Sequence, residues 1–459
     1  MATVRESQTQ LSSGGWRTEI SRYQWLVLVT TLLGWGLDGF DGNLYALVVG
    51  PAVTELLRNS AIDPTPQNIG YFGGLNVTAY LVGWALGAVL LGIVADYWGR
   101  VRVLMGSILM YSLFTGLSAL SQEWWQLGVF RFLTGLGSGV EWPIGAALVA
   151  ETWNNRYRAK AAGVMMSGFA IGFFLAAAVY GLVGHFGWRW VFAVGILPAL
   201  VVLLVRRGLH EPEAFHETRA RRERLRGASA ASLSEADRRF RRFVLTQLFS
   251  PPLLKHMLIC IGMSIGGLFA FWAVTTWVPQ IVRQLMAAQG ISGNDVIPYV
   301  TYSNLMLNAG GVVGYASWGF IADKIGRKPA LLLSYGVSLI SIWALFPFQT
   351  SFTVYMLLLP VVGFGIFGSF AGNAVYFPEL FGTHVRTTAV SLANNVGRLI
   401  TSPGPFIAGL LVAPFGGHFG MATTVVSSFL VISLLAILFA RETHGRMLTE
   451  EEIQDLVPG

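Results

Sequence analysis

The chain has 459 residues, of which 54% are hydrophobic and only 12% are charged. Soluble globular domains carry about 25% charged residues, so this composition excludes an ordinary soluble protein and indicates an integral membrane protein. The single cysteine, Cys260, excludes an intramolecular disulfide. The polar segment 1–23 lacks an apolar core followed by a small-residue cleavage site, so we expect no cleaved signal peptide.

Apolar runs separated by polar breaks predict twelve membrane-spanning helices. A run of about 20 residues, rising about 1.5 Å per residue, crosses a hydrocarbon core of about 30 Å. The expected spans are 24–50, 69–95, 103–121, 124–150, 160–184, 189–206, 256–282, 299–322, 329–347, 352–377, 386–413 and 418–440. The sequence therefore predicts an all-α membrane protein.

One long polar stretch, 207–255, divides the twelve spans into two sets of six. We expect a tail (1–23), an N-terminal bundle (24–206), a basic linker (207–255), a C-terminal bundle (256–440) and a second tail (441–459). Of the 31 Lys and Arg residues, those assigned to odd-numbered loops are Arg58, Arg189 and Arg283. The positive-inside rule then predicts that both tails and the linker are cytoplasmic, in a plasma membrane such as the bacterial inner membrane.

Two loops repeat the same pattern in the two halves of the chain. Gly92–Arg102 reads GIVADYWGRVR and Gly319–Lys328 reads GFIADKIGRK. The shared residues are Gly92, Asp96, Gly99 and Arg100 in the first loop, and Gly319, Asp323, Gly326 and Arg327 in the second. We interpret both loops as gating loops, in which the aspartate forms a latch with a basic residue of a neighbouring helix end.

A second pattern repeats at nearly the same separation along the chain. Glu151 and Arg158, separated by six residues, correspond to Glu379 and Arg386. Two independent repeats at one separation indicate a duplicated six-helix unit. Internal symmetry of this kind is typical of secondary transporters that rock two bundles about a site near the membrane midplane.

The first span carries two carboxylates, Asp38 and Asp41, near its middle. A charge at that depth costs at least about 2.5–3.5 kcal/mol on insertion scales, so an intramembrane acid is a candidate functional group. Asp38, Asp41 and Tyr45 are spaced three and four residues apart and share one helical face. We predict proton coupling by at least one of the two acids; a purely structural role in pairing or capping is the alternative.

The fourth span adds a third carboxylate, Glu141, and a buried arginine, Arg131. Ten residues separate them, which places them roughly 80° apart on a helix, so they can belong to one cluster without pairing directly. We assign both to the proton-coupling group. The alternative is that Glu141 is a structural partner, and that Arg131 only neutralises Asp38 or Asp41.

Arg398 in the eleventh span is the basic residue expected inside the C-terminal half. Asn394 lies one helical turn earlier, and a guanidinium with an amide can grip a carboxylate through two hydrogen bonds. We predict that Arg398 anchors a substrate anion; helix packing around a satisfied arginine is the alternative. The neutral residues expected to assist are Tyr45, Asn308, Asn373 and Tyr376.

The two gating loops resemble the signature loop of the major facilitator superfamily, and the resemblance extends over essentially the whole chain. LDGFD (Leu37–Asp41), GVEWP (Gly139–Pro143) and the segment Phe377–Arg398 are similar to proton-coupled organic-acid symporters of the sialate/monocarboxylate or aromatic-acid type. The resemblance implies the major facilitator fold, with twelve helices in two pseudo-symmetric bundles. It also implies a link between Arg131 and proton coupling.

These observations lead us to expect a symporter that imports a small organic carboxylate with protons by alternating access. The expected partners are the organic anion, protons and the lipid bilayer; we expect no cofactor, no resident metal, no nucleic acid and a monomer. A sugar or polyol porter and a drug–proton antiporter are alternatives within the same fold. A membrane enzyme and a non-transporting sensor are the alternatives of a different class.

Overall fold

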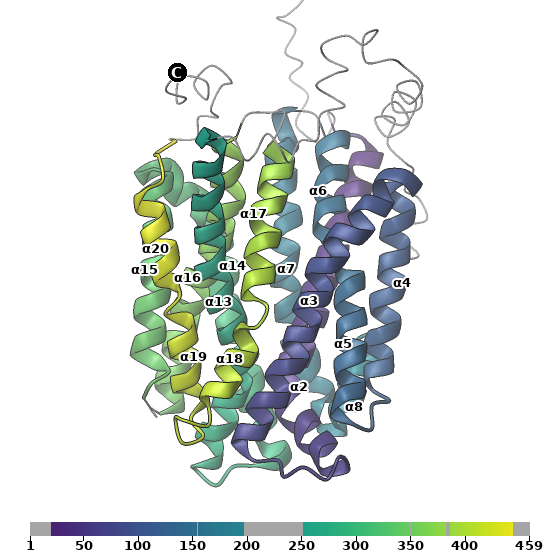
Figure 1. The fold of residues 1–459 in the computed structure, drawn as a ribbon, viewed down its shortest axis with the longest axis vertical. Helices are drawn as coiled ribbons and strands as arrows, with labels where there is room; N and C mark the ends of the chain where they lie inside the picture. The colour runs from purple at the N-terminus through teal and green to yellow at the C-terminus, as the bar shows by residue number, and fades with distance from the viewer. Residues whose placement is uncertain (1–19, 154, 197–250, 349–350, 382–385, 444–459) are drawn as a thin grey trace, which may run out of the picture.

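The computed structural model describes residues 20–153, 155–196, 251–348, 351–381 and 386–443. Every secondary-structure element within these ranges is a helix, which confirms the all-α prediction (Figure 1). The predicted linker lies outside the described residues up to 250, and its last residues, 251–255, belong to a helix. Most of both predicted tails also lies outside them.

The helices of the first half follow the expected spans closely. They are α2 (Arg22–Asn59), α3 (Pro66–Trp98), α4 (Arg100–Ser118), α5 (Trp124–Ser138), α6 (Glu141–Thr152), α7 (Asn155–Val183), the 3₁₀ turn η1 (Gly184–Phe186) and α8 (Trp188–Val194). Residues 197–206 of the predicted sixth span lie outside the described ranges.

The second half has the same overall organisation. Its elements are α13 (Pro251–Ala287), the 3₁₀ turn η3 (Gly293–Val296), α14 (Ile297–Ile325), α15 (Arg327–Leu345), α16 (Phe352–Glu379), α17 (Arg386–Thr401), α18 (Gly404–Leu411), α19 (Phe419–Ser427) and α20 (Leu430–Leu438). In the described part of the chain, eight helical segments are long and apolar enough to cross a membrane.

Three predicted spans are each divided into two helices. The fourth breaks between α5 and α6, where Pro143 cannot donate a backbone hydrogen bond to the carbonyl of Gly139. The eleventh breaks between α17 and α18, where Pro405 likewise cannot donate to Thr401. The twelfth breaks between α19 and α20 at Ser428. The sequence pattern therefore predicted these spans without their interruptions.

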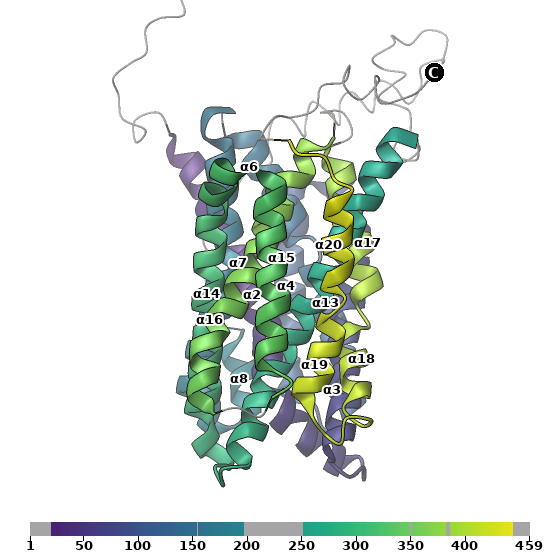
Figure 2. The same cartoon turned by 90° about the vertical axis from the view of Figure 1, so that its left-hand side faces the viewer.

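The helices form one bundle whose two ends can be distinguished by chain direction. We call the end at which α2 begins and α20 ends the terminal end, and the end at which α2 passes into α3 the far end. The first half lies mainly to the right and the second half mainly to the left in Figure 1, and the turned view in Figure 2 shows the same upright arrangement. The cavity described below lies between the halves.

Close approach of backbones holds α2 against α7 in the first half. A Cβ atom added to Gly172 would collide with the carbonyl oxygen of Gly36, and one added to Gly168 would press on the carbonyl oxygen of Leu32. Small residues that allow such contact are a common means of helix association in membranes, where no hydrophobic effect drives helices together.

Contacts between the two halves gather at the far end. The guanidinium of Arg283 in α13 donates from Nη2 to the carbonyl oxygen of Leu47 at 2.7 Å and to the hydroxyl of Tyr180 at 2.6 Å. The backbones of α3 and α18 also meet there, since a Cβ on Gly70 or Gly409 would collide with the other residue's carbonyl oxygen. The halves are therefore closed against each other at this end.

We expect Gly172→Ala to destabilise the protein, because the added methyl group has no space against α2. Overpacking of this kind costs about 1–3 kcal/mol. Thermal unfolding of the purified protein in detergent would measure the change. Gly163→Ala is the matched control, because it lies on the same helix and its added Cβ meets nothing within 4 Å. Equal unfolding temperatures for the two variants would contradict the prediction.

Candidate functional site

The first half contains a buried ion pair between Arg131 of α5 and Asp41 of α2. Nη1 of Arg131 lies 3.2 Å from Oδ2 of Asp41, and the two side chains are 1% and 4% exposed. The hydroxyl of Thr115 in α4 donates to Oδ1 of Asp41 at 2.5 Å. Of the two acids considered from sequence, Arg131 therefore pairs with Asp41, and the pair joins three helices.

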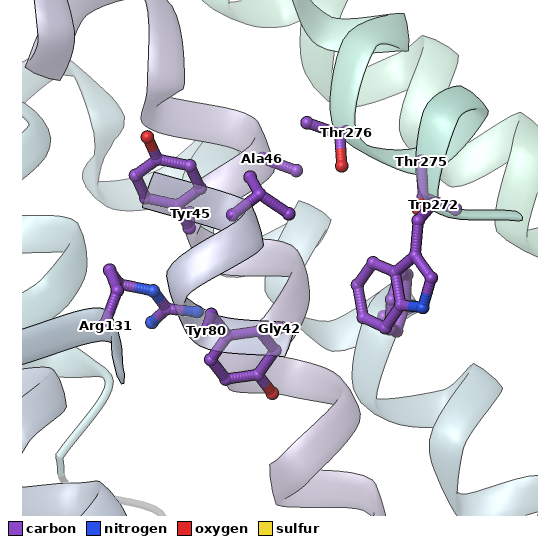
Figure 3. Close-up of a pocket in the computed structure, with 10 residues that line it drawn as sticks. Gly42, Tyr45, Ala46, Tyr80, Arg131, Trp272, Thr275 and Thr276 are labelled. Atoms are coloured by element: carbon purple, nitrogen blue, oxygen red, sulfur yellow. The ribbon is translucent and has the colours of Figure 1, made fainter. Parts of the chain in front are cut away.

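Two tyrosine rings sandwich the guanidinium of Arg131. Its Cζ atom lies 4.4 Å from the ring centroid of Tyr80 and 5.4 Å from that of Tyr45 (Figure 3). Cation–π contacts of this kind stabilise a cation that has lost its water. Figure 3 shows Thr275 and Thr276 of α13 facing these rings across a small chamber between the halves.

Asp38 is buried like Asp41 but has fewer partners. Its side chain is 0% exposed, its Oδ1 accepts a long hydrogen bond of 3.4 Å from the Tyr80 hydroxyl, and its Oδ2 has no hydrogen-bond partner among the described residues. It lies close enough to Asp41, Glu141 and Arg398 to interact electrostatically with each. Asp38 therefore stands between the ion pair of the first half and the arginine of the second half.

Glu141 is buried at the first position of α6, directly after the break that follows α5. Gly139 and Val140, which separate the two helices, both keep right-handed helical backbone angles. Glu141 belongs to the electrostatic surroundings of Asp38. Within the described ranges, no group of three or more His, Cys, Asp or Glu side chains could hold a metal ion.

Arg398 of α17 lies on the wall of a cavity between the two halves. Its Cζ atom stacks 4.1 Å from the ring of Trp84 in α3, a residue of the other half. Its Nη1 makes only a long 3.4 Å hydrogen bond to Oδ1 of Asn395, and its Nε is buried without a partner among the described residues. The guanidinium thus retains donors that an anion in the cavity could use.

Aromatic side chains form most of the cavity wall. The cavity volume is about 60 Å³. The aromatic residues are Trp35, Trp84, Trp142, Phe169, Phe271, Trp272, Tyr315 and Phe370. The polar ones are Asn373, Asn394 and Arg398. The site therefore combines flat apolar surfaces with one cation and two amides.

The structure brings together only some of the residues predicted to bind a substrate. Asn373 and Asn394 line the cavity with Arg398, whereas Tyr45 lines the neighbouring small chamber. Tyr376 lies elsewhere, with its hydroxyl donating to the carbonyl oxygen of Arg441. Asn308 is buried away from the cavity lining, and its Nδ2 donates to the carbonyl oxygen of Asn304 within α14.

Sequence reasoning missed most of the aromatic wall. Trp35 and Phe169 stack with ring centroids 4.6 Å apart, and Trp84 and Trp272 meet edge to face at 5.7 Å. In an apolar span, a tryptophan is indistinguishable by pattern from a residue that packs against lipid or another helix. No pattern along the chain therefore identifies these residues as members of one cavity wall.

The two gating loops share a backbone conformation. Gly99 and Gly326 have φ values of 111° and 98°, which only glycine adopts without strain. In the second loop, Nη1 of Arg327 lies 2.6 Å from Oδ1 of Asp323, and its Nε lies 3.3 Å from Oε1 of Glu379 in α16. These two contacts lie within one half. The side chain of Asp96 lies outside the described residues.

The remaining residues of the two predicted gating loops are Gly92, Gly319 and Arg100. A Cβ on Gly92 or Gly319 would meet nothing within 4 Å, so neither glycine is required by close packing. Arg100 begins α4, as Arg327 begins α15. The repeated sequence therefore produces the same connection twice. Gly99 lies between α3 and α4, and Gly326 lies between α14 and α15.

We expect Arg131→Met to destabilise the protein strongly, because it leaves Asp41 buried without its counter-charge. Removing one partner of a buried pair typically costs about 3–5 kcal/mol. The double variant Arg131→Met/Asp41→Asn should be less destabilised than Arg131→Met alone, as measured by unfolding in detergent. Additive losses in the double variant would mean that the two side chains do not interact.

Comparisons with known proteins identify the family. The sequence profile of the Major Facilitator Superfamily matches residues 25–405 and 309–457. The chain is 33% identical to the "Probable 4-methylmuconolactone transporter" of Cupriavidus pinatubonensis, covering 90% of this chain and 89% of that protein. It is 30% identical to the "Cis,cis-muconate transport protein" of Acinetobacter baylyi, covering 94% and 98%. Both relatives bear the names of organic-acid transporters, which confirms the resemblance found in the sequence.

The fold is confirmed by a solved structure. A crystal structure of a D-xylose–proton symporter superposes with a TM-score of 0.71, covering 93% of this chain and all of that one. Sequence identity between the two is only 17%, so the likeness concerns the fold alone. The chain belongs to the major facilitator superfamily and is a multi-pass membrane transport protein rather than an enzyme.

Proposed function

We propose that this protein is a proton-coupled symporter that imports a small organic carboxylate by alternating access. The observation that carries the proposal is the position of Arg398. It lies on the wall of an aromatic cavity between the two halves, and within electrostatic range of the buried acid Asp38. One cation thereby faces both a site for an anion and a group that can exchange a proton.

Arg398 is the proposed anchor for the substrate carboxylate. Its ring contact with Trp84 fixes the plane of the guanidinium but leaves N–H groups for a ligand. A carboxylate accepts two parallel hydrogen bonds from such a group, and these bonds are stronger than those between neutral partners. Asn394 stands one turn away on the same cavity wall and assists as a neutral partner.

Asp38 is the proposed proton carrier. Asp41 already has a counter-charge in Arg131 and a hydroxyl donor in Thr115, so its contacts are structural. Asp38 accepts one long hydrogen bond from Tyr80, the hydroxyl of Ser138 lies near it, and its Oδ2 has no hydrogen-bond partner among the described residues. A buried intramembrane acid without an ion-pair partner among the described residues is the candidate for exchanging a proton.

Coupling follows from competition for Arg398. When Asp38 is ionised, its charge partly neutralises the guanidinium and weakens the attraction for a substrate anion. When Asp38 binds a proton, the positive charge of Arg398 is available to the substrate. Proton and anion therefore favour each other's binding, which is the thermodynamic requirement for symport.

The proposed orientation places the terminal end in the cytoplasm, as the distribution of Lys and Arg predicts. Contacts at the far end, including those of Arg283, then close the path to the outside. In this state the cavity belongs to the inward-facing form. Rocking of the bundles 24–206 and 256–440, with the two gating loops at the cytoplasmic end, would open the opposite side.

The proposed substrates are flat carboxylates, either aromatic or unsaturated. Aromatic walls such as Trp84 and Trp272 stack on flat apolar surfaces. Relatives named for muconate and 4-methylmuconolactone support the same class. A sugar would find few hydrogen-bonding groups on this wall, which disfavours a sugar or polyol porter.

Arg398→Gln should weaken carboxylate binding, because it removes a charged hydrogen-bond donor worth about 1.5–3 kcal/mol. This corresponds to an increase of roughly 10–150-fold in the dissociation constant. Titration of the purified protein with benzoate and muconate, followed by tryptophan fluorescence, would measure it. Arg398→Lys keeps the charge but not the planar fork, so an intermediate loss is expected. Unchanged binding by Arg398→Gln would exclude this residue as the anchor.

Asp38→Asn should abolish substrate accumulation driven by a proton gradient while leaving exchange of internal for external substrate. The amide mimics the neutral acid and cannot release a proton. Uptake into proteoliposomes, with and without an inward proton gradient, separates the two activities. Normal gradient-driven accumulation by Asp38→Asn would contradict the assignment. If the wild-type protein binds acids but never accumulates them, the sensor alternative is favoured.

A further inference from the structure

Asn373 of α16 lines the cavity that contains Arg398, and its amide is the second one there besides that of Asn394. Its side chain is only 7% exposed, and it lines the cavity together with Trp272 and Phe370. Nothing in the proposed grip on a carboxylate requires it, since Arg398 and Asn394 both belong to α17. The amide therefore needs its own explanation.

A buried tyrosine determines which atom of the amide is used. The hydroxyl of Tyr335 in α15 lies 2.8 Å from Oδ1 of Asn373 and 3.3 Å from the carbonyl oxygen of Met263. It has one proton to donate. The contact with Oδ1 of Asn373 is the shorter of the two, so the tyrosine proton goes to Asn373.

The oxygen of the Asn373 amide is thus occupied, and its Nδ2 remains as a donor. Among the described residues, no hydrogen bond donated by this nitrogen is found, and the residue lines the cavity. Asn394 has the opposite arrangement, because its Nδ2 donates to the carbonyl oxygen of Val390 and leaves its oxygen as an acceptor. Tyr335 is fully buried, so the amide of Asn373 is held in this orientation.

We propose that Asn373 is a specificity-determining residue that donates a hydrogen bond to a second acceptor on the substrate. This inference rests on the proposed function, in which Arg398 holds the carboxylate. The substrate class is then narrower than flat carboxylates. It comprises those with a further hydroxyl, carbonyl or carboxyl oxygen, and Tyr335 is the positioning residue that keeps the donor directed at that oxygen.

The physical basis is that a buried donor left without a hydrogen-bond partner costs more free energy than an average hydrogen bond contributes. An acid without a second acceptor displaces water from the cavity and leaves the Asn373 N–H groups without a partner. Sites built to hydrogen-bond a ligand group discriminate against analogues that lack it, because the polar group of the site is left unpaired. An acid with the acceptor avoids this loss.

The test compares benzoate with meta- and para-hydroxybenzoate and with terephthalate. Dissociation constants are measured on the purified full chain in detergent. We expect the wild-type protein to bind at least one of the substituted acids about ten-fold more tightly than benzoate. Asn373→Leu should remove this preference while retaining benzoate binding. Tyr335→Phe should reduce the preference, because the amide can then turn its oxygen to the cavity.

Two further variants make the test specific. Asn373→Asp replaces the donor by an acceptor, so terephthalate should be weakened most, by charge repulsion, whereas a hydroxybenzoate can still donate its own O–H to the new carboxylate. Tyr355→Phe removes a tyrosine hydroxyl outside this cavity, and its preference should match that of the wild type. An unchanged preference in Asn373→Leu overturns the inference, as does a wild-type protein that binds benzoate most tightly.

Failure of this inference is distinguishable from failure of the proposed function. Benzoate binding that depends on Arg398, without any preference dependent on Asn373, overturns the inference alone. Absence of binding for all four acids overturns the proposed function, and the inference with it.

Discussion

The buried pair of Asp41 and Arg131 is the interaction on which the arrangement of the first half depends. It joins α2 to α5 and, through Thr115, to α4, in a region where water cannot supply the missing hydrogen bonds. Neither charge is tolerable there without the other. The rings of Tyr45 and Tyr80 lie against the guanidinium of Arg131 and extend the contacts of this pair.

Outside this pair, Asp38 and Arg398 each have a buried polar atom without a hydrogen-bond partner among the described residues, as Arg131 has at its Nε. Asp38 belongs to the first half and Arg398 to the second, and the cavity lies between the halves. Aromatic walls give the cavity its shape, whereas the polar groups are few and each has a distinct orientation. In the proposed function, the rings supply binding area, and Arg398 and Asn373 supply recognition.

The sequence predicted the all-α architecture, because a bilayer requires long apolar helices and makes buried charges conspicuous. It also identified Asp38, Asp41, Arg131 and Arg398 as unusual for the same reason. It did not predict the breaks after α5 and α17, since an apolar run continues across them. At each break a proline has no N–H to donate to the carbonyl one turn earlier, as with Pro143 and Gly139 and with Pro405 and Thr401.

The details of the site depend on how each helix is rotated and tilted against its neighbours, which a single sequence does not specify. Tyr376 and Asn308 were selected as polar residues in apolar spans, but their bonds go to a backbone carbonyl rather than to the cavity. Tyr335 was overlooked because its role appears only through its contact with Asn373. Residues that act on other residues leave no pattern along the chain.

The contact of Arg283 at the far end has an electrostatic consequence. Its hydrogen-bond partners are the backbone carbonyls of Leu47 and Pro279 and the hydroxyl of Tyr180, and in the described part of the chain no carboxylate forms an ion pair with it. A closure made by an ion pair would be electrically neutral, whereas this one keeps its positive charge while it is shut. Under the proposed alternating access, this charge would attract anions to the far end before it opens, and their rate of arrival would fall as salt screens the charge.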